Sequence, residues 1–168
     1  MPEFKELQFV RVIDPNIFRL IPRYLFEQVK DYEFDIEKLI NYGAAITANP
    51  LTYLFALADS ENKIKGIFWA RISYVDEIFE AYLLSVDPEY QDETALRTTL
   101  DFFWRLHKTE KPKLKKQGIN LKDKILWQTT RPKPFEKIAG VEKSKRILME
   151  IENVALSTEN KKPDSQSS

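Results

Sequence analysis

The stretch from Leu84 to Leu96 has residue types and spacing that could bind an anion. An alternating apolar run over residues 78–86 ends at Asp87-Pro88, and a helical pattern begins within a few residues. A strand that turns sharply into a helix exposes free backbone N–H groups and the positive end of the helix dipole, which together favour phosphate. The sequence therefore predicts a possible phosphate-binding turn here.

This stretch resembles the signature of the GNAT acyltransferases, in which a strand reading L-x-V-x-P-x-Y is followed by Q/R-x-x-G-x-G/A. The first half is present as Leu84, Val86, Pro88 and Tyr90, with Gln91 opening the loop. In that family the glycine-rich turn binds the pyrophosphate of acetyl-CoA. The resemblance implies that an acetyl-CoA site in this chain would use Val86, Gln91, Asp92, Glu93, Thr94, Ala95 and Leu96.

The second half of the signature is missing. Thr94 and Leu96 stand where the family has glycines, and side chains obstruct the approach of a pyrophosphate to the backbone. The Asp92 carboxylate can also bond the amide of residue 94 or 95 and so occupy a donor that a phosphate needs. With Glu89 and Glu93 nearby, charge repulsion adds about 1 to 4 kcal/mol per close pair. We therefore expect no bound cofactor unless the protein is active, in which case it is acetyl-CoA.

The resemblance also identifies the groups that would transfer protons. Residues 135–141 are similar to the family's F-Y-E-K-L-G-F segment, but Phe135 stands in place of the tyrosine that protonates the leaving thiolate. Glu136 could replace it only if burial raised its pKa. Because the family often places a carboxylate in the strand before the signature, Glu80 is the first candidate base and Glu77 the second. Strand alternation also allows Glu80 to be simply solvated.

Composition limits the remaining chemistry. The chain has no cysteine, which excludes disulfides, thiolate catalysis and cysteine-ligated metals. His107 is the only histidine and falls at the far end of its helix from the loop, so we expect a helix-end role and no metal site. No apolar run approaches the ~20 residues of a bilayer span. The expected location is the cytoplasm, or a virion if a phage encodes the protein.

The net charge of zero conceals two opposed regions. Residues 72–96 contain seven acids and no lysine or arginine, whereas residues 108–124 contain seven lysines and two acids. A lysine run is usually a solvated loop, but it could also hold an anionic partner in a salt-dependent manner. The residues of this candidate patch are Lys111, Lys113, Lys115, Lys116, Lys122 and Lys124.

Hydrophobic periodicity predicts strands and helices in alternation. Asp14 and Asp35 are expected to cap the first two helices, with Pro22 kinking the first helical run or marking its true start. The helix after the signature should end near Thr109, and residues 110–124 should form a polar connection. The expected strands are 7–13, 52–58, 64–75, 78–86, 125–129 and 144–152, with a short helix over 134–139.

These elements predict an α+β (α/β/α-like) domain of GNAT-like fold, with a central mixed, mostly antiparallel sheet flanked by helices. We expect a single domain over residues 1–156 and a disordered polar tail over 157–168. The degenerate loop and the missing tyrosine favour a non-catalytic binding or structural module with a protein partner or assembly. The alternative is an active acetyl-CoA-dependent N-acetyltransferase acting on a cationic amine. A third and weaker interpretation is a phage accessory or virion protein.

Overall fold

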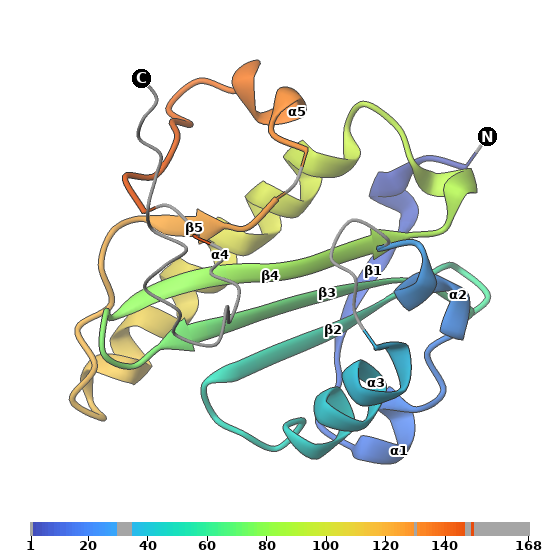
Figure 1. Ribbon diagram of the computed structural model, residues 1–168, viewed down its shortest axis with the longest axis horizontal. Helices are drawn as coiled ribbons and strands as arrows, with labels where there is room; N and C mark the ends of the chain where they lie inside the picture. The colour runs from blue at the N-terminus through green and yellow to red at the C-terminus, as the bar shows by residue number, and fades with distance from the viewer. Residues whose placement is uncertain (1, 30–34, 130, 147–148, 150–168) are drawn as a thin grey trace, which may run out of the picture.

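A computed structural model describes residues 2–29, 35–129, 131–146 and 149. Its centre is a five-stranded sheet in the order β1-β2-β3-β4-β5, antiparallel except for the parallel pair β4 and β5. Helices flank the sheet on both faces, which confirms the predicted α+β architecture (Figure 1). The strands are β1 (Gln8–Arg11), β2 (Thr52–Ala58), β3 (Ile64–Ser73), β4 (Ile78–Val86) and β5 (Ile125–Trp127).

Each face of the sheet has its own hydrophobic core. On one face, α1 (Pro15–Phe18), α2 (Arg23–Glu27) and α3 (Ile36–Ala45) pack their apolar side chains against residues that include Trp69. On the other face lies the long helix α4 (Ala95–Lys115), whose Phe103 is fully buried against Phe68 and Phe79. Short 3-10 helices, η1 (Phe4–Glu6) and η3 (Pro88–Tyr90), precede β1 and follow β4.

The predicted helix starts are confirmed. Asp14 Oδ1 accepts a hydrogen bond from the Asn16 amide at 2.8 Å, and Asp35 Oδ1 accepts one from Lys38 at 3.1 Å, so both aspartates cap their helices. Pro22 stands immediately before α2 and separates it from α1. The first helical run is therefore two short helices, because proline cannot continue the ladder of a preceding helix.

Helix α4 is longer than predicted. We expected its end near Thr109, but it continues to Lys115 with Pro112 inside it. A buried stripe explains the extension, since Phe103, His107, Glu110 and Leu114 recur at helical spacing and all are buried. The charge of residues 110–115 made this stretch look like a loop, although Glu110 and Leu114 face the core.

The C-terminal part is less regular than predicted. Strand β5 ends at Trp127 rather than Thr129, and α5 covers Lys133–Glu136 rather than 134–139. Of the strand expected over 144–152, residues 144–146 are not in a strand, and most of the rest lies outside the described residues, as does the expected tail. Among the described helices, none has the length and apolar character needed to cross a bilayer.

Candidate ligand-binding site

Strands β4 and β5 separate soon after they pair. Their parallel register covers only Phe79 with Ile125, Glu80 with Leu126, and Ala81 with Trp127. Beyond that point β4 continues to Val86, and a cavity of about 850 Å³ lies beside it. The volume is in the range of small-molecule and cofactor sites. Its walls come from residues 82–86 of β4, the loop and first turn of α4, and residues 127–138 around α5.

A β-bulge at Tyr82 shapes the β4 wall of this cavity. Trp69 of β3 pairs with Leu83 and Ala70 pairs with Ala81, so the register shifts by one residue at Tyr82. Before the bulge, Ala81 contributes to the core under α4. Tyr82 and Leu83 both pack on the opposite face, and Leu84 returns to the α4 side. The bulge therefore reverses the alternation of β4 at the place where β5 leaves it.

The predicted cofactor-binding residues lie together with one exception. Thr94 does not line the cavity, whereas the other six do: Val86, Gln91, Asp92, Glu93, Ala95 and Leu96. The carbonyl of Val86 accepts hydrogen bonds from the side-chain amides of Gln91 at 2.8 Å and Gln28 at 3.2 Å. Gln91 thus holds the loop, and Gln28 the end of α2, to the end of β4 at the start of the cavity wall.

Positive charge lines the cavity from two sides. Arg97 lies in the first turn of α4, and Arg131, Lys133 and Lys137 surround α5. Within the described part of the chain, the side chains of Arg97, Lys133 and Lys137 form no ion pair. The cations around α5 could not be predicted from the sequence, because nothing local indicates that the α5 segment folds back over the loop. Among the described residues, four basic side chains and two acids, Asp92 and Glu93, line the cavity.

The Asp92 carboxylate is occupied by protein donors. Its Oδ1 accepts hydrogen bonds from the Thr94 amide at 2.9 Å and hydroxyl at 2.7 Å, and its Oδ2 accepts one from the Phe4 amide at 3.1 Å. Burial acts to raise the pKa of Asp92, but these donors outweigh it and the pKa is lowered. The predicted contact with the amide of residue 94 is confirmed. The carboxylate also ties η1 to the start of α4.

The first turn of α4 keeps donors that a ligand could use. The first bond of the helix runs from the Thr98 amide to the Thr94 carbonyl at 2.8 Å. The amides of Leu96 and Arg97 make no hydrogen bond to any described residue. Both residues line the cavity, so the turn offers an anion backbone donors as well as the Arg97 guanidinium.

Replacing Asp92 by Asn is expected to make stability less sensitive to acid. The folded pKa of Asp92 is depressed, so its contribution is present above the unfolded value near 3.8 and is lost as pH falls through the folded pKa. Urea unfolding measured from pH 7 to pH 2.5 should therefore show a smaller loss of stability in D92N than in the wild type. Parallel pH profiles would contradict the contact with Phe4 and Thr94.

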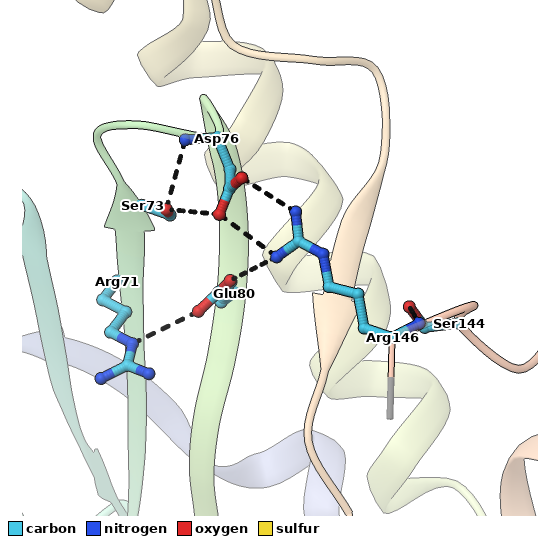
Figure 2. A network of polar contacts seen from close by, with 6 residues as sticks. All are labelled: Arg71, Ser73, Asp76, Glu80, Ser144 and Arg146. Carbon is cyan, nitrogen blue, oxygen red and sulfur yellow. Dashed lines mark hydrogen bonds and ion pairs between the residues drawn. The ribbon is translucent and has the colours of Figure 1, made fainter. Parts of the chain in front are cut away.

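The two candidate bases lie away from the cavity. The Glu80 carboxylate sits between two arginines, with Oε2 3.4 Å from Nε of Arg71 and Oε1 3.9 Å from Nη1 of Arg146 (Figure 2). Glu77 occupies the turn before β4 with a left-handed φ of 56°, and its carboxylate accepts a hydrogen bond from the Asn120 amide. Neither side chain lines the cavity, and both are engaged by other residues.

The segment that resembles F-Y-E-K-L-G-F does reach the cavity. Phe135 lines it and packs edge-on against Trp127, with ring centroids 5.4 Å apart, but its ring carries no hydroxyl. Glu136 is exposed, so the burial that could have made it a proton donor is absent. Tyr82 also lines the cavity. Its place in the cavity could not be predicted from the sequence, because a bulge inside a regular alternating strand leaves no local signal.

The remaining candidates are structural or peripheral. His107 is buried, and its Nε2 lies 2.7 Å from the carbonyl oxygen of Lys122, which holds the following loop to α4. In the lysine patch, Lys111 pairs with Asp123 and Lys113 with Glu110, while the other four lysines are exposed. None of the patch lysines lines the cavity. No group of histidines and acids among the described residues is arranged to hold a metal ion.

Solved structures match this fold at low sequence identity. A "possible acetyltransferase" from Clostridium difficile 630 aligns with a TM-score of 0.61 and 11% identity over 88% of this chain and 96% of its own. A "predicted acetyltransferase with acetyl-CoA" from Clostridium acetobutylicum gives 0.61 and 15% over 86% and 96%. No protein-family model matches the sequence, and no curated protein matches it significantly. At these identities the likeness establishes the fold alone.

Proposed function

We propose, from the GNAT fold that this chain has, that it binds a CoA thioester in the cavity between β4 and β5 without transferring the acyl group efficiently. The observation that carries the proposal is the set of cations around the cavity, Arg97, Lys133 and Lys137, which have no ion-pair partner among the described residues. Such a cavity favours a ligand that carries several negative charges. The structural neighbour described with acetyl-CoA supports the same ligand class.

The residues of the cavity fit the parts of such a ligand. Arg97 and the amides of Leu96 and Arg97 would hold phosphate, with Lys133 and Lys137 on the opposite wall. The apolar walls that would face the ligand's chain come from Leu84, Trp127 and Ile138. When bound, a CoA thioester supplies an activated acyl group. Asp92 repels the ligand's phosphate less than its charge suggests, because its carboxylate already accepts hydrogen bonds from Phe4 and Thr94.

The groups for acyl transfer are poorly placed. Phe135 stands where the family resemblance expects a tyrosine, so that position has no proton to give to a leaving thiolate. Glu80, the first candidate base, does not line the cavity, and its carboxylate is held between Arg71 and Arg146. General acid and base catalysis each contribute about 10²- to 10⁴-fold to rate. Losing both would leave a module that binds its ligand and transfers little.

Tryptophan fluorescence tests the binding. Of the three tryptophans, only Trp127 lines the cavity, while Trp69 is buried in the other core and Trp104 lies on the outer side of α4. Titration with acetyl-CoA should change the emission of the wild type, and Trp127→Phe should remove most of that change. An unchanged wild-type spectrum at millimolar acetyl-CoA, or a full response in W127F, would contradict the proposed site.

A transfer assay separates binding from catalysis. With saturating acetyl-CoA and a panel of primary amines, release of CoA by the wild type should stay within a few-fold of the uncatalysed rate. Phe135→Tyr restores a hydroxyl beside Trp127 and should raise the rate, whereas Phe135→Leu serves as the matched control and should not. Rapid turnover by the wild type would favour the active N-acetyltransferase instead.

A further inference from the structure

Polar side chains at the turn between β3 and β4 hold the guanidinium of Arg146. Its Nη2 lies 3.0 Å from Asp76 Oδ1, and its Nη1 donates to Asp76 Oδ2 at 3.2 Å, a two-bond arrangement that suits a planar guanidinium (Figure 2). Nη1 also lies 3.9 Å from Glu80 Oε1. Arg146 thus connects the segment after α5 to the edge of the sheet.

The two carboxylates are positioned by contacts that do not involve Arg146. The Ser73 hydroxyl donates to Asp76 Oδ2 at 3.0 Å and accepts a hydrogen bond from the Asp76 amide at 3.4 Å. On the far side of Glu80, Arg71 Nε lies 3.4 Å from Oε2, and the Glu80 side chain is only 14% exposed. The acceptor atoms therefore keep their arrangement if Arg146 leaves, with Arg71 beside Glu80 and the more distant charge of Lys122 acting on Asp76.

Arg146 itself is held by few other contacts. Its side chain is 53% exposed, and its amide donates to the Ser144 hydroxyl oxygen at 3.1 Å. Residues 137–146 contain neither helix nor strand. Arg146 is therefore a half-exposed cation on an irregular segment. Another cation could replace it beside Asp76 and Glu80, since these two acids are held by other residues.

We propose that Asp76, Glu80 and Ser73 form a binding site for the guanidinium group of a second molecule, and that Arg146 is its internal competitor. A group tethered to the same chain competes as if it were present at a concentration of millimolar order. Arg146 therefore masks an external guanidinium whose dissociation constant lies above that concentration. Release of the Arg146 side chain would expose the site. The site does not require the ligand of the cavity, since none of these residues lines it.

Titration with N-acetylarginine amide, followed by the amide NMR signals of residues 73–80, tests this site. Arg146→Ala should bind the probe at least about fivefold more tightly than the wild type, because the internal competitor is gone. Adding Asp76→Asn to R146A should abolish that gain. Arg146→Gln, which keeps a long side chain, should behave like R146A and covers the case in which R146A folds poorly.

Arg23→Ala provides a matched control. Arg23 is 52% exposed and also contacts two carboxylates, those of Glu27 and Glu37, so its removal frees a surface acid pair elsewhere. Signals of residues 73–80 in R23A should respond to the probe as in the wild type. Equal affinity in the wild type and R146A, or an undiminished gain in D76N/R146A, would overturn the proposal. Acetyl-CoA binding reported by Trp127 is read separately, so failure of one proposal does not mimic failure of the other.

Discussion

Reversing two charges beside α5, with Lys133→Glu and Lys137→Glu together, should weaken acetyl-CoA binding by at least about thirtyfold. Each reversal removes an attraction and adds a repulsion, and a close pair contributes about 1 kcal/mol in water. Two reversals therefore cost about 4 kcal/mol before screening by salt, and half of this already lowers the affinity about thirtyfold, since each 1.4 kcal/mol is tenfold. Both lysines line the cavity without an ion-pair partner in the described part of the chain. Isothermal titration calorimetry at low salt measures the effect.

The control for this variant reverses two lysines elsewhere. Lys115→Glu with Lys116→Glu changes the net charge by the same amount at the end of α4, away from the cavity. The affinity of this control variant for acetyl-CoA should stay within about threefold of the wild-type value, since salt screens exposed charges that lie far from the ligand. If both double variants lost affinity equally, the attraction would come from overall charge and not from the cavity.

Truncating Phe103 to alanine should destabilise the fold by about 3–5 kcal/mol. The side chain is fully buried, and its ring centroid lies 4.8 Å from that of Phe79 and 5.4 Å from that of Phe68. It also lies 6.3 Å from Trp127, so its loss removes packing beneath the cavity. Urea denaturation measures the change in the free energy of unfolding from the shift in the midpoint concentration, provided that the dependence of this free energy on urea concentration is unchanged.

Trp104→Ala is the control on the same helix. Trp104 is 43% exposed and one residue from Phe103, so its truncation removes a similar or larger ring while opening no cavity in the core. We expect it to destabilise the protein far less than F103A. A loss below about 1 kcal/mol in F103A would show that α4 does not pack on the sheet through this face.

The sheet could be predicted from the sequence because its signals are local. Strands β2 and β4 have the predicted bounds, since alternating or continuous apolar runs there end at Asp59 and Asp87. The end of α4 could not be placed, because its last turns bury only Glu110 and Leu114 among many lysines. In that stretch, the helix is stabilised by packing of its buried side chains against parts of the chain that are distant in sequence, and the local composition does not indicate this.

The candidate site was only half predictable. The loop after Val86 was found because strand, turn and helix adjoin in sequence. The cations of residues 131–137 and the bulge at Tyr82 depend on long-range folding, and neither has a pattern in a single sequence. The acid count of the loop alone therefore predicted a site unfavourable to anions, while the described lining of the folded cavity contains more basic residues than acids.

The most direct measurement is a calorimetric titration of the wild-type protein with acetyl-CoA at two salt concentrations. We expect one site per chain, with a dissociation constant in the micromolar range at low salt that rises with salt as the Arg97, Lys133 and Lys137 contacts are screened. No heat at millimolar acetyl-CoA would contradict it, as would an affinity that salt leaves unchanged.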